Sequence, residues 1–215
     1  MSRSDRCVKT CHELRSALPI AEGQVVPFQC DVSSEDQVHE TVRSIVSHFG
    51  KIDALVNAAG VSIDRLVLKT TKADLLEIFG TNTFGSLYMA KAASRYMIKE
   101  KKGSIVFIGS IVGVTGGVGQ IAYASSKSAL IGATKTLSLE LAQYGIRTNL
   151  VSLGFVHTDM TAHVPEFTKE KYRMQTPGQR FSTVEEASQV VLKVLEDREM
   201  NGRHVLVNGD LVSFL

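Results

Sequence analysis

The chain has 215 residues, of which 44% are hydrophobic and 21% charged, and its formal net charge is +2. This balance predicts one globular domain with a substantial core. We expect no membrane, nucleic-acid or secretory role, because no apolar run could span a bilayer, no basic run is interleaved with aromatics, and the first residues lack an apolar signal core. The three cysteines, an odd number, indicate reduced thiols, and we expect no metal site.

Strand and helix patterns alternate along the chain. The expected elements are, in order, a polar helix (5–18), a strand (24–30), a helix (33–50), a strand (54–56), a helical stretch (71–99), an apolar strand (104–109), a helix (121–142), a strand (146–152), a helix (185–196) and a strand (204–207). The long stretch should break near Gly80, and Asn82 favours a kink because its amide competes for backbone hydrogen bonds. The alternation predicts a doubly wound parallel α/β sheet, Rossmann-like, in a single domain over 1–215.

Polar residues that end the predicted strands are the first candidates for a site. Ligands of doubly wound sheets bind at the carboxyl ends of the strands. Here those positions hold Asp31, Asn57, Ser110 and the turn 154–158.

Tyr123 and Lys127 are four residues apart in a predicted helix, so their side chains share one face. An unperturbed phenol, with a pKa of about 10, is a weak acid at neutral pH. A cation about 5 Å away, at an effective dielectric constant near 20, would favour the phenolate by roughly 3 kcal/mol. Taken alone, the pair also fits a solvated helix face. Ser110 strengthens the catalytic interpretation, because its hydroxyl could hydrogen-bond the carbonyl that Tyr123 protonates.

The same residues resemble the motifs of the short-chain dehydrogenase/reductase family. In family order and spacing, the chain has Asn57-Ala58-Ala59-Gly60, Asn82, Ser110, Tyr123-x-x-x-Lys127 and Gly154-x-x-x-Thr158. Within the family it looks most like the 3-oxoacyl-[acyl-carrier-protein] reductases of the carbonyl reductase family member 4 type. The segments 109–113 and 154–161 carry that narrower likeness.

The resemblance implies hydride transfer from NADPH to a carbonyl carbon, with a proton following onto oxygen. Tyr123 would be the general acid and Ser110 would polarise the carbonyl. Lys127 would lower the tyrosine pKa and hold the nicotinamide ribose, and Asn82 would fix a water in a proton relay. The cofactor would lie against Asp31 and Val32 at the adenine, Asn57, Ala58, Ala59 and Gly60 along the trench, Val156 and Thr158 at the carboxamide, and Arg3 at the 2′-phosphate, with Arg6 as a second candidate there.

One departure from the family is large. Its opening strand, Thr-Gly-x-x-x-Gly-x-Gly loop, helix and second strand would precede Asp5, and roughly 30 residues of this kind are expected to be lacking. We therefore expect an incomplete Rossmann-like sheet without the pyrophosphate-binding loop. The segment 113–119 also reads Gly-x-x-x-Gly-x-Gly, but no ribose-reading residue follows its next strand, so we expect a substrate-side loop there.

Three hypotheses about function remain open. The first is an NADPH-dependent reductase of 3-oxoacyl thioesters on acyl-carrier protein, in fatty acid synthesis. The second is a cofactor-deficient, non-catalytic subunit of a homo- or hetero-tetramer, pairing through helices 71–99 and 121–142. The third is a steroid or other alcohol dehydrogenase, with its substrate chosen by segment 155–181. Each of the three hypotheses is compatible with a protein located in the mitochondrial matrix or the cytoplasm.

A basic cluster bears on the first hypothesis. Lys99, Lys101 and Lys102 precede the strand that leads to Ser110 and could attract an acidic carrier protein. Lys101 aligns with one of the family's two basic carrier-docking positions. The other falls on Tyr144, which is not basic, and a solvated lysine cluster explains the pattern equally well.

Overall fold

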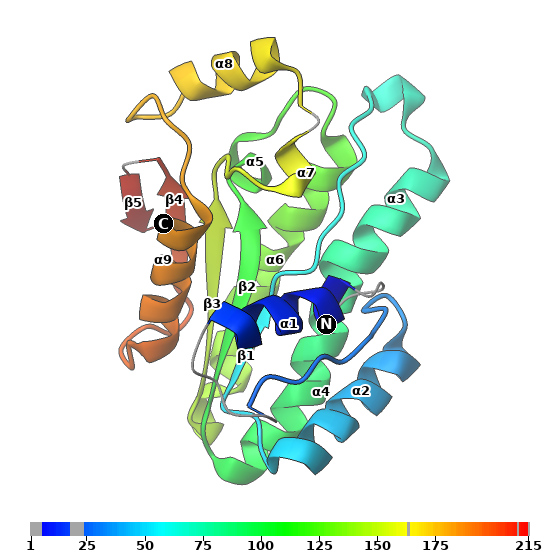
Figure 1. Ribbon diagram of the computed structural model, residues 1–215, viewed down its shortest axis with the longest axis vertical. Coiled ribbons are helices and arrows are strands. Elements are labelled where there is room, and N and C mark those ends of the chain that lie inside the picture. The colour runs from blue at the N-terminus through cyan, green and yellow to red at the C-terminus, as the bar shows by residue number, and fades with distance from the viewer. Residues whose placement is uncertain (1–5, 18–23, 163, 210, 215) are drawn as a thin grey trace.

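A computed structural model describes residues 6–17, 24–162, 164–209 and 211–214, and in these ranges it shows a sheet covered by helices (Figure 1). The strands are β1 (Ala54–Asn57), β2 (Gly103–Ser110), β3 (Ile146–Leu153), β4 (His204–Asn208) and β5 (Leu211–Phe214). They are hydrogen-bonded in that order, with β1 to β4 parallel and β5 antiparallel to β4. The predicted Rossmann-like class is confirmed, and β5 is an addition that the sequence reading missed.

Helices separate most of the strands as expected, but the alternation fails near the amino end, where the first two helices have no strand between them among the described residues. They are α1 (Arg6–Ala17), α2 (Glu35–Phe49), α3 (Lys72–Phe79), α4 (Gly85–Glu100), α5 (Val112–Thr115), α6 (Ile121–Glu140), α7 (Asp159–Ala162), α8 (Glu166–Met174) and α9 (Val184–Glu196). Single turns of 3-10 helix lie at Val67–Lys69 and Ala142–Tyr144, and a π-helical turn lies at Gly80–Phe84.

The sheet separates two apolar cores. On one face, β2 contributes Ile105 and Phe107 to a cluster that includes residues of α2, α4 and α6. On the other face, Val106 of β2 and Val151 of β3 pack with α9. Alternate side chains of a strand point to opposite faces, so a strand buried on both faces must be apolar throughout. The continuous apolar run at 104–109 therefore predicted the centre of the fold.

The long helical stretch is interrupted where expected. Thr71 begins α3 with a capping box, since its hydroxyl accepts from the Asp74 amide while the Asp74 carboxylate accepts from the Thr71 amide. The π-helical turn then inserts between α3 and α4 and carries Asn82. Such turns often occur at functional sites in helices.

The predicted strand at 24–30 is wrong. In that segment only Gln29 has a bridge assignment, and no strand forms. Within the segment only Cys30 is buried, whereas Val25, Val26 and Phe28 are half-buried. A strand needs a hydrogen-bonding neighbour along its length. Among the described strands, the sheet's first member is β1, which pairs with β2 alone.

Candidate active site

Ser110, Tyr123 and Lys127 come together where β2 ends against α6. Tyr123 and Lys127 lie one turn apart on α6, and the Lys127 Nζ is 5.9 Å from the centre of the Tyr123 ring. The Ser110 hydroxyl lies close enough to the Tyr123 phenol to lower the pKa of that phenol. Close packing at Gly113 holds this arrangement, because a Cβ there would lie 3.1 Å from the Lys127 carbonyl carbon. The spacing in the sequence therefore predicted a real cluster.

The electrostatics of the pair differ from the expectation. Burial raises the pKa of Tyr123, the Ser110 hydroxyl lowers it, and the Asp64 charge raises it further. Lys127 was expected to lower the tyrosine pKa, but in this structure the pKa of Tyr123 is raised, and burial is the largest cause. Burial also lowers the pKa of Lys127 to about 8. Its ammonium donates to the Ile108 carbonyl at 2.8 Å, which satisfies one of its protons.

Asn82 connects the loop after β1 to the catalytic helix. Its Nδ2 donates to the Val61 carbonyl and to the Ser126 hydroxyl, each at 3.0 Å, and its Oδ1 accepts from the Val61 amide at 2.8 Å. Ser126 in turn donates to the Tyr123 carbonyl at 2.7 Å. Both amide protons of Asn82 are thus used by protein groups, and a relay water could bind this side chain only at the remaining lone pair of Oδ1. The relay role stays a prediction.

The residues predicted to line the cofactor trench follow β1 directly. Ala58 and Ala59 are exposed, and Gly60 lies beside the catalytic residues, since a Cβ on it would be 3.4 Å from both Asn82 Oδ1 and Lys127 Nζ. Asn57 is buried, and its Nδ2 has no hydrogen-bond partner among the described residues. A buried amide without a partner is costly. This orphan donor and the Lys127 ammonium fit the polar nicotinamide end of a dinucleotide.

The residues predicted at the adenine have local structural roles. The Asp31 carboxylate accepts from the Ser33 amide at 3.0 Å and from its hydroxyl at 2.7 Å, which shapes the turn into α2. Val32 packs so closely on Gly85 of α4 that a Cβ there would be 2.8 Å from the valine Cγ2. Arg3 lies outside the described residues, and Arg6 is the first residue of α1. Adenine contact therefore remains a prediction for Asp31 and Val32.

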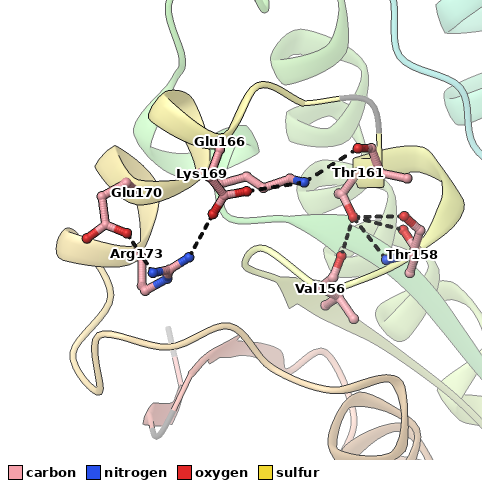
Figure 2. A network of polar contacts seen from close by, with 8 residues as sticks. Val156, Thr158, Thr161, Glu166, Lys169, Glu170 and Arg173 are labelled. Carbon is pink, nitrogen blue, oxygen red and sulfur yellow. Dashed lines mark hydrogen bonds and ion pairs between the residues drawn. The ribbon is translucent and has the colours of Figure 1, made fainter.

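The turn after β3 carries the last two predicted cofactor residues. Val156 is buried and forms a bridge with Ser182, whereas Thr158 is exposed. Thr161, which the sequence reading did not select, makes the contacts that hold this turn (Figure 2). A threonine three residues after another threonine is a recognisable pattern for a side chain that bonds local backbone.

The basic cluster lies at the other end of the sheet. Lys101 caps α4 in the left-handed conformation just before β2 begins, whereas Ser110 ends that strand. At about 3.3 Å per residue, β2 separates the two by about 23 Å. A hollow of about 820 Å³ also opens at this amino end, with Lys102, Ser104 and Arg147 among its lining residues. Neither feature belongs to the candidate active site.

Comparisons with known proteins identify the family. The short chain dehydrogenase family model matches residues 1–169. Carbonyl reductase family member 4 of Xenopus tropicalis is 39% identical over 199 residues, 93% of this chain and 83% of the relative. The human 3-oxoacyl-[acyl-carrier-protein] reductase is 40% identical over 189 residues, 88% and 78% of the two chains. NAD+-bound xylitol dehydrogenase superimposes with a TM-score of 0.80 at 32% identity, covering 85% of this chain and 77% of that one.

The chain therefore belongs to the short-chain dehydrogenase/reductase family of NAD(P)-dependent oxidoreductases. Within the ranges that the structure describes, no cluster of three or more His, Cys, Asp or Glu side chains could hold a metal ion. Across those same residues, no helix is both long and apolar enough to cross a membrane.

Proposed function

We propose that the protein uses NADPH to reduce a carbonyl group, with a 3-oxoacyl thioester on acyl-carrier protein as the substrate. The observation that carries the proposal is the contact between the Ser110 hydroxyl and the Tyr123 phenol, with the Lys127 ammonium beside it. The names of relatives at about 40% identity support the substrate class. By the same likeness, we propose a single domain acting in fatty acid synthesis in the mitochondrial matrix or cytoplasm.

The three side chains divide the chemistry of the carbonyl oxygen. The nicotinamide cofactor supplies the hydride when it is bound. The Ser110 hydroxyl can donate a hydrogen bond to the carbonyl oxygen and polarise it, and Tyr123 can then give its phenolic proton to the developing alkoxide. The Lys127 ammonium stabilises the phenolate left behind. Because burial raises the pKa of Tyr123, the phenol holds its proton until the oxygen becomes strongly basic.

The cofactor would be held from two sides. On the β1 side, Asn57 offers its unpaired amide and Gly60 leaves room beside Lys127. On the β3 side, the turn with Val156 and Thr158 would face the carboxamide. Asp31, Val32, Ala58 and Ala59 would complete the trench toward the adenine. A basic residue near the amino end, Arg3 by the family resemblance, would favour NADPH over NADH.

A non-catalytic subunit is the second candidate. Val56 of β1 is 40% exposed, which is unusual for a parallel strand, and the amide of the adjacent Asn57 lacks a partner within the described ranges. Both features favour the hypothesis that another polypeptide segment must pack against β1 before this chain can bind the cofactor. Pairing of α3, α4 and α6 with a related subunit would then give a homo- or hetero-tetramer.

Fluorescence titration of the 215-residue protein with NADPH separates the candidates. The reductase hypothesis predicts saturable enhancement or shift of the nicotinamide emission and NADPH oxidation with acetoacetyl thioesters. Saturable binding with NADPH oxidation only on steroid ketones would favour the third hypothesis from the sequence. No binding up to millimolar NADPH, together with assembly with a related reductase, would contradict the reductase proposal and support the non-catalytic subunit.

A further inference from the structure

Thr161 is placed to control the shape of the turn after β3. Its hydroxyl accepts from the Thr158 amide at 2.9 Å and lies 2.8 Å from the Val156 carbonyl, to which it donates (Figure 2). The Thr158 carbonyl, at 3.0 Å, is a second acceptor for the same proton. One hydroxyl therefore bonds both residues that are predicted to contact the nicotinamide.

The hydroxyl of Thr158 remains available to a ligand. It lies 3.5 Å from the Thr161 hydroxyl, which is the outer limit of a hydrogen bond, and Thr158 is exposed. The Thr161 hydroxyl meanwhile uses its only proton and one of its acceptor lone pairs within the turn. The two threonines thus differ in what they can do, since one is committed to the backbone and the other is open to solvent.

The support for Thr161 extends to α8. Lys169 of α8 donates to the Ala162 carbonyl at 3.4 Å, next to Thr161, and its ammonium is 3.8 Å from Glu166 (Figure 2). Arg173 pairs with Glu166 at 3.2 Å and with Glu170 at 2.6 Å. These contacts connect α7 to a face of α8 whose side chains are joined to one another by ion pairs.

Arg173 also connects α8 to the turn after β3 through two stacked aromatic rings. The Arg173 guanidinium lies 5.7 Å from the centre of the Phe181 ring, which stacks on Phe155 at 4.2 Å. Phe155 immediately precedes Val156, and its carbonyl accepts from the Ser182 amide at 3.2 Å. Within segment 155–181, which was predicted to choose the substrate, the turn is therefore held at one end by stacked rings and at the other by the Thr161 hydroxyl.

We propose that Thr161 is a positioning residue whose hydroxyl fixes the Val156–Thr158 turn in the shape that grips the nicotinamide end of the cofactor. The grip on the cofactor rests on the proposed function, whereas the fixing of the turn does not. A hydroxyl at this position would couple the shape of the Val156–Thr158 turn to that of the rest of segment 155–181.

The test compares Thr161→Val with Thr161→Ser in the 215-residue protein. Valine keeps the shape and removes the hydroxyl, while serine keeps the hydroxyl. Hydrogen exchange of the Thr158 amide, measured by NMR without cofactor, should accelerate about fivefold or more in Thr161→Val, as expected for loss of one net hydrogen bond. Thr161→Ser should stay within about twofold of the parent. Thr168→Val, a hydroxyl deletion in α8 outside this network, is the control.

The cofactor part is measured separately. The KM for NADPH should rise about five- to tenfold in Thr161→Val, with kcat changed less and serine restoring the parent value. Unchanged exchange in Thr161→Val would overturn the proposal whatever the activity. Faster exchange with unchanged NADPH affinity would overturn the grip on the cofactor. A parent protein that binds no NADPH would refute the proposed function, and the exchange result would still decide whether Thr161 fixes the turn.

Discussion

β1 and β2 are neighbouring parallel strands with different surroundings. They pair residue for residue from Ala54 with Ser104 to Asn57 with Phe107. Every residue of β2 from Gly103 to Phe107 is buried, whereas β1 alternates exposed and buried positions. Leu55 is 8% exposed and Val56 is 40% exposed. One face of β1 is therefore packed and the other faces solvent in this structure.

The contrast divides the candidate site into two halves. The half that handles the proton lies between β2 and α6, where side chains and backbone support one another closely. The half that would hold the cofactor lies along β1 and the segment before α2, where Asn57 keeps an unpaired amide. The proton half is therefore supported by packing within the chain, whereas the cofactor half keeps a polar group that a ligand could bind.

The largest expected effect tests the proton half. Tyr123→Phe keeps the ring beside Lys127 and removes the phenolic proton, so carbonyl reduction should fall by about 10²- to 10⁴-fold. The measurement is the steady-state rate of NADPH oxidation with a ketone or thioester substrate. The NADPH dissociation constant should change little, because the ring and the Lys127 ammonium remain. A loss of less than about tenfold would show that another group supplies the proton.

A second effect tests the packing near β1. A Cβ on Gly85 would lie 2.8 Å from Val32 Cγ2 and 2.9 Å from the Val32 carbonyl, which is backbone and cannot rotate away. Gly85→Ala should therefore reduce the free energy of unfolding by about 1–3 kcal/mol, measured by urea denaturation.

Gly132→Ala is the matched control for that experiment. Gly132 also lies within a helix, but a Cβ there would meet nothing within 4 Å. Alanine should stabilise this position by roughly 0.5–1 kcal/mol through its better helix propensity. Equal stability changes in Gly85→Ala and Gly132→Ala would mean that Val32 is not held against α4, and the cofactor half would then be less ordered than the structure shows.

The buried lysine gives the proton half a pH signature. The pKa of Lys127 is about 8 when folded, against 10.5 as the ordinary value, so the unfolded chain binds more protons between these limits. The penalty for burying the ammonium is complete below pH 8 and is relieved as the pH rises above it. The contribution of Lys127 to the free energy of unfolding should therefore increase by about 1–2 kcal/mol from pH 8 to pH 9.5. Tyr123, with a raised pKa, acts oppositely only at higher pH.

Urea denaturation at the two pH values, with parent protein and Lys127→Met, measures this contribution. The increase should be present in the parent and absent from the variant. Lys135→Met is the matched control, since it removes an exposed α6 lysine that also donates to a carbonyl, that of Gly202, at 2.8 Å. If both variants lose the increase equally, the pH dependence does not come from Lys127.

The sequence predicted the two halves unequally, for physical reasons. Local signals predicted the elements around the proton half: an apolar run for β2, a helical stretch that begins at Thr71 for α3, and Asn82 near the break in that stretch. The strand at 24–30 was wrong because a local apolar pattern does not show whether a strand has a hydrogen-bonding neighbour elsewhere in the chain. The direction of the Tyr123 pKa change was wrong because the cost of burial depends on tertiary packing. Thr161 was missed because the threonine spacing indicates a local backbone contact but does not show that this contact shapes a predicted cofactor turn.

The smallest expected effect concerns the basic cluster at the amino end of β2. If an acidic carrier protein docks there, reversing the charge with Lys101→Glu and Lys102→Glu together should raise the KM for carrier-bound substrates a few-fold, as for exposed charge contacts, and leave small ketones unaffected. The effect should shrink as salt is added, because exposed charges are screened. Lys193→Glu, on α9, serves as the matched charge reversal away from the cluster. Since β2 separates the cluster from Ser110 in the same chain, equal effects on carrier-bound and free substrates would contradict docking and leave Lys101 and Lys102 as solvated charges.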